Sequence, residues 1–298
     1  MLSKEQIKSF IREKPEMSKS VGFYPAFLID PCCLPLESTD KDEEEVFGNY
    51  QHVTIKSAKS LPHGHYARLI IAYLTTEIIK RPELPSYIIG NSASDLFKRV
   101  TGQSKVSGGT FYNFMECFQR VLGIEFIIKP THKSNTKIEI IGSFSDFSII
   151  VGNDTEKVQH YENYKKILFT PSKEFKKLLI EYRRFISIDM RFLRLSRNKK
   201  IALADDLYIY LVRRGYMKKR TSFIRLNVLQ KDIFPYLKHL TPSRFKSRLE
   251  NALDFIKDCH PDMKSKLSED GGFLEVYPNC NLLRVQPKDD TKDNAKIE

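Results

Sequence analysis

Apolar residues recur every three or four positions in several segments of this 298-residue chain, which is the spacing of one buried helix face. The clearest example covers 241–258, where Arg, Ser and Asn fall on the face opposite the apolar positions. Thr241 is a suitable N-cap, Pro242 fits the first turn, and Pro261 marks the end. The pattern predicts an amphipathic helix whose polar face can contact a partner, although an ordinary surface helix has the same pattern.

The first half of the chain has a recognisable order of elements. Helical periodicity covers 65–80, a short strand follows at 87–89, and two short helices are predicted over 92–102 and 110–122. Strand-like alternation on both sides of a polar turn predicts a hairpin over 124–141. Because the two short helices are joined by a tight turn that contains glycine, this order predicts a winged helix with 110–122 as its recognition helix.

A similar order returns in the second half, although the sequence itself is not repeated. The predicted elements are a strand at 167–170, a helix capped by Ser172, an extended segment at 186–192, a helix over 201–214, a strand at 223–224, a short helix over 226–234, the helix over 241–258, and a hairpin joining 272–276 to 282–286. The sequence therefore predicts a second winged helix, in which 241–258 is the recognition helix.

These elements predict an α+β protein with two tandem winged-helix domains and short β-hairpin wings. The expected divisions are an N-terminal helix and irregular acidic arm over 1–56, the first winged-helix domain over 57–152, a linker over 153–164, the second winged-helix domain over 165–287, and a charged tail over 288–298. Within the arm, we expect the acidic run Asp40–Glu45 to be an exposed loop, and 48–56 alternates as a strand does.

The positive charge is concentrated in one region. The whole chain carries a formal net charge of +12, and Tyr161–Lys238 contains 20 Lys and Arg against 7 Asp and Glu, a net of +13. The remaining residues therefore sum to −1. A segregated basic excess favours a polyanionic partner, of which nucleic acid is the commonest, over a merely solvated surface. Membrane binding is less favoured, because no basic helix with exposed bulky apolar residues is predicted.

The cysteine pattern and the hydropathy narrow the class of protein further. The five cysteines include no CxxC pair, so neither a zinc site nor a disulfide framework is indicated. No run of eighteen apolar residues is present, and the charged start MLSKEQIKSFIREK does not resemble a signal peptide. We expect a cytoplasmic protein that binds no membrane, metal or cofactor.

For each candidate catalytic group in the sequence, a purely structural explanation is at least as good as a catalytic one. The sequence lacks GxxxxGK[ST], HExxH and GxSxG motifs and a GxGxxG after a strand. His63-Gly64-His65 is compatible with the metal site of a Tyr-dependent nickase, but a glycine separates the histidines and a helix follows. Asp205 and Asp206 are adjacent on a helix, about 100° apart, so they do not by themselves form a carboxylate pair. Gly108-Gly109 is better explained by a turn between helices than by phosphate binding. We expect no enzymatic activity.

Both predicted recognition helices carry residues suited to DNA. In the first, the candidates are Lys105, Ser107, Thr110, Asn113 and Arg120. The outward or partly outward positions of this helix include Asn113, Glu116, Gln119 and Arg120. In the second, the candidates are Arg244, Lys246, Ser247, Arg248 and Asn251, and nearby Lys218, Lys219 and Arg220 can contact phosphates. Asn and Gln pair with adenine edges and Arg with guanine, whereas phosphate contacts position the protein without reading sequence.

Several segments, taken in order, resemble the RepA-type family of plasmid replication initiators. The segments are LPHGHYARLIIAYLTTEII, SASDLFKRVTG and VSGGTFYNFMECFQRVLG, then LFTPSKEFKKLL, ALADDLYIYLVRR and RFKSRLENALDFIKDCHP. The resemblance covers about 61–286. The chain has no Trp, and Tyr73 stands where the family pattern would place one. The residues before 61 match nothing in the family pattern.

The resemblance implies a function and partners. It implies two winged-helix domains that bind double-stranded DNA at repeated origin sequences, open the adjacent duplex with host DnaA, and load the host replicative helicase. It also implies the absence of catalysis and is compatible with a homodimer. Two alternatives remain from the residues: a transcriptional repressor built on winged helices, and a Tyr-dependent origin nickase.

Overall fold

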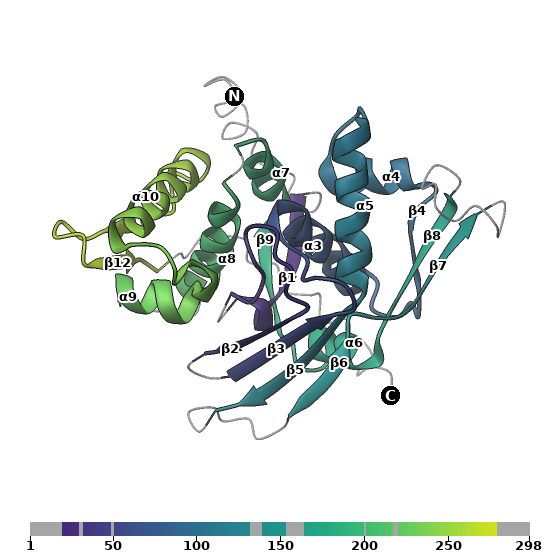
Figure 1. The fold of residues 1–298 in the computed structure, drawn as a ribbon, viewed down its shortest axis with the longest axis horizontal. Coiled ribbons are helices and arrows are strands. Elements are labelled where there is room, and N and C mark those ends of the chain that lie inside the picture. The colour runs from purple at the N-terminus through teal and green to yellow at the C-terminus, as the bar shows by residue number, and fades with distance from the viewer. Residues whose placement is uncertain are drawn as a thin grey trace, which may run out of the picture.

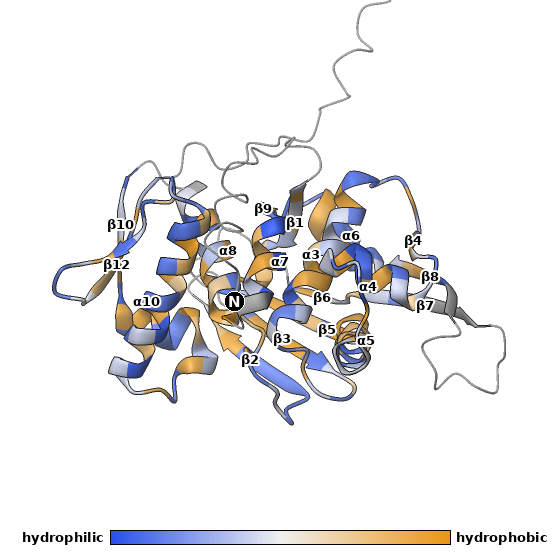
Figure 2. Cartoon of the chain, turned by 90° about the horizontal axis from the view of Figure 1, so that it is seen from above, coloured by the Kyte–Doolittle hydropathy of each residue, from blue (hydrophilic) through white to orange (hydrophobic). Residues whose placement is uncertain are grey.

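The computed structural model confirms the α+β class, with helices packed among four small antiparallel sheets in the residues that it describes. These residues are 20–29, 32–48, 51–131, 139–152, 164–199, 201–216 and 220–278. In Figures 1 and 2, α10 and β12 lie at one end, β7 and β8 lie at the other, and α3 is between them.

The first group of helices forms where the periodicity predicts it. It consists of α3 (Gly64–Lys80), α4 (Ala93–Thr101) and α5 (Gly108–Leu122). Ser92 caps α4 by accepting a hydrogen bond from the amide of Asp95. Most of α3 is buried, and it contacts β1, α5, α7 and α8, so this helix joins elements from both halves of the chain.

A four-stranded sheet with the order β2-β3-β5-β6 contains the predicted hairpin. Its strands are β2 (Glu43–Phe47), β3 (Gln51–Ser57), β5 (Ile124–Pro130) and β6 (Ile140–Ser143). The expectation of an irregular arm with an exposed acidic loop is wrong for β2, which pairs with β3. The acidic run is compatible with a strand because Val46 faces the core while Glu43 and Glu45 face solvent, which is the alternation of period two.

Two further sheets connect segments that we assigned to different domains. β8 (Tyr164–Pro171) pairs with β4 (Tyr87–Gly90) and with β7 (Ser145–Gly152), although we placed β8 in the second domain. β1 (Val21–Pro25) pairs with β9 (Phe185–Asp189), so part of the N-terminal arm packs with the second half. The predicted division at 153–164 therefore does not separate the strand pairs.

The second half contains the predicted helices in the predicted order, and one further helix, α7, that the sequence did not predict. The elements are α6 (Lys173–Ile180), α7 (Met190–Lys199), α8 (Ala202–Tyr216), β10 (Ser222–Arg225), α9 (Leu226–Val228) continued by η3 (Leu229–Ile233) and η4 (Pro235–Leu237), α10 (Pro242–Cys259), β11 (Lys266–Leu267) and β12 (Phe273–Val276). The sheet has the order β10-β12-β11. The segment 186–192 is not extended throughout, because α7 begins at Met190.

The strand pairing at the end of this second group differs from the predicted hairpin. β12 pairs with β11 and β10, and the sequence analysis missed β11 because it has two residues. The predicted partner strand at 282–286 lies outside the described residues. The predicted N-terminal helix, most of the polar turn at 131–137, most of the linker and the charged tail lie outside them as well. None of the described helices is long and apolar enough to cross a bilayer.

Candidate nucleic-acid interface

The helix α10 has the two faces that the sequence predicts. Its apolar positions Phe245, Leu249, Ala252, Leu253 and Ile256 are buried. Thr241 accepts a hydrogen bond from the amide of Arg244 at 3.5 Å, which confirms the N-cap. Arg244, Ser247, Arg248 and Asn251 are exposed. The helix therefore packs through one side and leaves the other side available.

The exposed face of α10 is not uniform, because some of its residues contact neighbouring elements. Ser247 and Asn251 line a groove of about 660 Å³ together with Lys264 and Lys266, which follow the helix. Lys246 lies against the turn between β11 and β12, where a Cβ on Gly271 would be 2.2 Å from the Lys246 Nζ. The sequence analysis missed Lys264 and Lys266 because they belong to no periodic segment.

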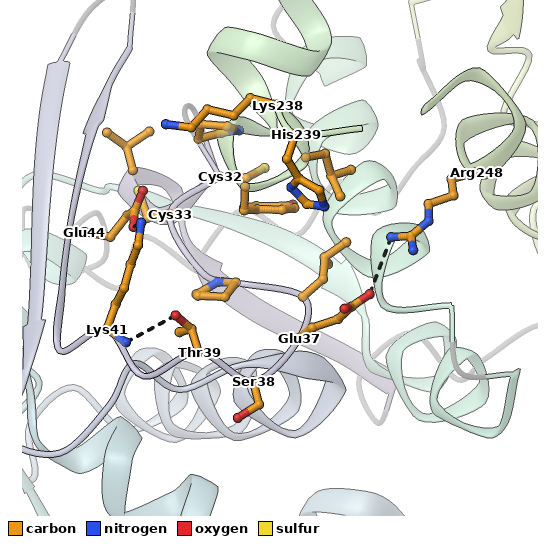
Figure 3. A pocket seen from close by; sticks show the side chains of 16 residues that line it. Cys32, Cys33, Glu37, Ser38, Thr39, Lys41, Glu44, Lys238, His239 and Arg248 are labelled. Atoms are coloured by element: carbon orange, nitrogen blue, oxygen red, sulfur yellow. Dashed lines mark hydrogen bonds and ion pairs between the residues drawn. The ribbon is translucent and has the colours of Figure 1, made fainter. Parts of the chain in front are cut away.

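Arg248 contacts the N-terminal arm. Its Nη1 lies 3.5 Å from Glu37 Oε1, beside a pocket of about 300 Å³ between the arm and η4 (Figure 3). Both side chains are largely exposed, so this ion pair contributes at most about 1 kcal/mol. A phosphate can therefore replace Glu37 at little cost, and Arg248 stays a candidate DNA contact.

The candidates of the first group gather at the start and along the outer face of α5. Lys105, Ser107 and Asn113 are exposed and Thr110 is half-buried. Ser107 is the N-cap residue, but its side chain makes no capping hydrogen bond. Arg120 is only partly outward. Only 19% of its side chain is exposed, and its Nη1 lies 3.4 Å from His63 Nδ1.

Gly108 and Gly109 belong to the first turn of α5, not to the connection before it as we expected. A Cβ built at either residue would have no atom within 4 Å. Neither residue has the positive φ that would require glycine. Internal packing and backbone geometry therefore do not explain these glycines. Their lack of side chains leaves the backbone at the start of α5 open to close approach.

A polar cleft of about 670 Å³ brings the α5 candidates together with residues from other elements. Its lining includes Ser107, Thr110, Asn113 and Arg120 of α5, His63 and Tyr66 at the start of α3, and Arg197 of α7. The sequence analysis missed Arg197 as a site residue because it lies 77 positions after Arg120, and only its place in the basic region indicated a role.

Of the third set of candidates, Lys218, Lys219 and Arg220, only Arg220 lies within the described residues. Lys218 and Lys219 lie outside the described residues. Arg220 is exposed and precedes β10. The roles of all these residues in DNA binding stay predictions, because a surface position alone does not distinguish a contact residue from an ordinary polar one.

The histidines that suggested a nickase have other contacts. His65 Nδ1 lies 2.6 Å from Asp205 Oδ2, and this carboxylate also accepts a hydrogen bond from Ser196. Burial raises the pKa of Asp205, and the neighbouring His65 opposes this shift. Gly64 has a φ of 67°, a left-handed conformation that favours glycine, so the His-Gly-His sequence fits a turn into α3. Within the described segments, no group of three or more His, Cys, Asp or Glu could hold a metal ion.

Asp206, next to Asp205, belongs to a separate buried pair. The Arg68 guanidinium donates to both Asp206 oxygens, at 2.8 Å from Nε and 2.6 Å from Nη2. The same guanidinium donates to the carbonyls of Leu34, Pro35 and Gly64. These contacts join α3, α8 and the arm, so they fix the first group of helices relative to the second.

No family model matches the sequence, and no curated protein matches it. The fold is similar to a crystal structure of domains 2 and 3 of RctB, in a selenomethionine derivative, with a TM-score of 0.57 and 14% sequence identity. The match covers 83% of this chain and 95% of that chain. A second crystal structure of the same two domains matches with a TM-score of 0.49 and 16% identity, over 83% of this chain and 94% of that chain. At this identity, the likeness shows a shared fold.

Proposed function

We propose that this protein is a sequence-specific DNA-binding initiator of plasmid replication. The observation that carries the proposal is that α5 and α10 each bury one face and expose polar residues on the other, and that α10 also exposes Arg244 and Arg248. The fold shared with domains 2 and 3 of RctB, a replication initiator of Vibrio chromosome II, supports an initiator function in general. The net charge of +12 supports a polyanionic partner.

In the proposed complex, α5 and α10 each contact the DNA at a separate site. Asn113 of α5 and Asn251 of α10 suit adenine edges, and Arg244 suits guanine, with ~1–3 kcal/mol of discrimination for each good bidentate contact. Two winged helices on one chain would occupy major grooves about one helical turn apart, ~34 Å along the duplex. A bend between the two contacts would favour opening of a neighbouring AT-rich segment.

The proposed initiation requires no covalent step. The protein binds origin repeats, and host DnaA and the host replicative helicase, partners taken from the RepA-type resemblance, act on the duplex that it distorts. The free energy of DNA binding alone distorts the duplex, and we propose no enzymatic activity. Because α3, α8 and the arm share the Arg68 network, we expect both DNA contacts to form on a single rigid unit.

Footprinting tests this proposal. The protein should protect direct repeats near its own gene on the replicon that encodes it, and deletion of the gene should abolish replication of that replicon. Arg244→Ala should weaken protection of the repeats more than it weakens binding to random DNA. Protection of a promoter alone, with replication unaffected by the deletion, would show that the protein is the alternative, a transcriptional repressor.

The nickase alternative has its own test. Supercoiled origin DNA is incubated with the protein and Mg²⁺ or Mn²⁺, and the products are examined for relaxed circles with covalently attached protein. We expect no such product, because no group of three or more His, Cys, Asp or Glu around His65 or elsewhere in the described residues could hold a metal ion. A relaxed, protein-linked circle that is lost in His65→Ala would overturn this part of the proposal.

A further inference from the structure

The cleft between α3, α5 and α7 combines two guanidinium groups with the polar face of a proposed reading helix. Arg120 comes from α5 and Arg197 from α7, and Ser107, Thr110 and Asn113 line the same cleft. At about 670 Å³ it is larger than the pocket beside the arm, which is about 300 Å³. Its lining therefore holds two guanidinium groups against one carboxylate, that of Glu116, together with several hydrogen-bond donors, which suits a phosphate.

The two arginines are held in place by their contacts. Arg120 Nη2 lies 3.9 Å from Glu116 Oε1, which is a long ion pair with a glutamate that is 61% exposed. Arg197 Nη1 donates to the Tyr66 hydroxyl at 3.2 Å, and its guanidinium lies 5.7 Å from the centre of the Tyr66 ring. The phenol orients Arg197 and itself carries no formal negative charge.

The surroundings of His63 are consistent with a positive potential in the cleft. Burial lowers the pKa of His63, and the charges of Arg120 and Arg68 lower it further. The backbone carbonyl of Leu61 and the carboxylate of Glu116 oppose this shift, but the pKa of His63 is lowered overall.

The helix α7 is fixed to the first group of helices, although it belongs to the second half of the sequence. Arg194 Nε donates to the carbonyl of Val100 at 3.1 Å, and its Nη2 donates to that of Arg99 at 2.8 Å, at the end of α4. Arg197 follows one turn later on the same helix. Its position relative to α5 is therefore determined by packing and not by a flexible linker.

We propose that this cleft binds a backbone phosphate of the DNA strand that borders the groove read by α5, through Arg197 and Arg120 together. This rests on the proposed function. A helix in the major groove has the phosphates of both strands beside it, because the groove is only ~12 Å wide. The row Ser107–Thr110–Asn113 on α5 is both part of the cleft lining and the proposed reading face, which favours a DNA phosphate over a free nucleotide.

The position of Arg197 gives this contact a second consequence. Ser196, its neighbour, donates a hydrogen bond to Asp205 of α8, so α7 contacts both the first group of helices and the second. A phosphate held by Arg197 thus connects DNA binding at α5 to α8, which lies in the predicted second winged-helix domain.

Substitution of single phosphates tests the proposal. The full chain is bound to origin-repeat duplexes in which one backbone phosphate at a time is replaced by an uncharged methylphosphonate. We expect one position, beside the α5 site, at which the wild type loses about tenfold in affinity. Arg197→Gln should lose a similar factor on the unmodified duplex and should be insensitive to the methylphosphonate at that position. Its slope of log K against log salt should be smaller in magnitude by about 0.9.

Two further variants separate a specific contact from a loss of charge or of folding. Lys166→Gln removes the same charge from an exposed position on β8 and should keep the sensitivity at that phosphate. Tyr66→Phe removes the hydroxyl that orients Arg197 and should give an intermediate loss of affinity, with an unchanged circular dichroism spectrum. If Arg197→Gln keeps the salt slope and the methylphosphonate sensitivity of the wild type, the cleft does not bind a phosphate of the DNA.

The outcomes distinguish this proposal from the function on which it rests. Tight, sequence-specific binding by the wild type with no effect of Arg197→Gln overturns the phosphate contact and leaves the initiator function intact. Absence of any DNA binding by the wild type overturns both. Binding of ATP or inorganic phosphate that depends on Arg197 but does not compete with DNA would show a small-molecule site and overturn the proposal.

Discussion

Replacing Asp206 by Asn should destabilise the fold strongly, because it removes the negative partner of a fully buried arginine. Arg68 is 0% exposed and Asp206 is 3% exposed at their side chains. The guanidinium makes five hydrogen bonds, two to Asp206 and three to backbone carbonyls, which uses every donor that an arginine has. Burial by itself would lower the pKa of Arg68, but the charge and hydrogen bonds of Asp206 raise it above the ordinary value.

The magnitude follows from this geometry. Removal of one partner from a buried ion pair costs ~3–5 kcal/mol, because the other charge stays buried without compensation. An Asn amide also turns a donor toward Arg68 or toward the hydroxyl of Tyr236, which donates to Asp206 in the wild type. We therefore expect Asp206→Asn to lower the free energy of unfolding by an amount within this range.

Urea denaturation, followed by far-ultraviolet circular dichroism and by tyrosine fluorescence, measures this loss, since the chain has 14 Tyr and no Trp. Glu43→Gln is the matched control. It breaks the pair between Glu43 and Lys56, at 3.0 Å on side chains that are 48% and 45% exposed, and should cost no more than ~1 kcal/mol. A loss in Asp206→Asn no larger than in this control would refute the view that the buried pair joins the two groups of helices.

Three other predictions concern the pH dependence due to His260, the glycine at position 109, and the DNA contacts of Arg244 and Arg220. Burial lowers the pKa of His260 from 6.5 to about 4, so the folded state favours the neutral imidazole. The contribution of neutral His260 to the free energy of unfolding is complete above pH 6.5. It is lost as the pH falls toward 4, at ~1.4 kcal/mol per pH unit. His260→Phe keeps the stacking on Tyr208 and should remove this part of the pH dependence; an identical profile of unfolding free energy would contradict the assignment. Gly109→Ala should stabilise α5 by ~0.5–1 kcal/mol and weaken DNA binding, and tighter binding in a gel-shift titration would show that nothing approaches this backbone closely. Arg244→Ala should reduce discrimination between repeat and random DNA, whereas Arg220→Ala should weaken both about equally, so the same discrimination ratio in the two variants would show that the assignment is wrong.

The sequence by itself determined the helices and their buried faces. The helix over 241–258 was predicted with its N-cap and its apolar side, and α3, α4 and α5 lie close to their expected limits. This succeeds because helical periodicity and capping depend on residues within a few positions of one another. The residues also placed polar and basic side chains on the exposed side of α10.

The tertiary structure alone decided which distant segments meet. β2 became a strand through pairing with β3, and β8 joined β4 across the boundary that we expected. Asp206 and Arg68 are 138 positions apart, and Arg197 shares a cleft with Arg120. Such contacts form only when long loops close and when whole faces of helices and sheets fit against one another. The spacing of residues within one segment predicts neither event. The chemistry of each candidate residue was therefore readable in the sequence, whereas its neighbours were not.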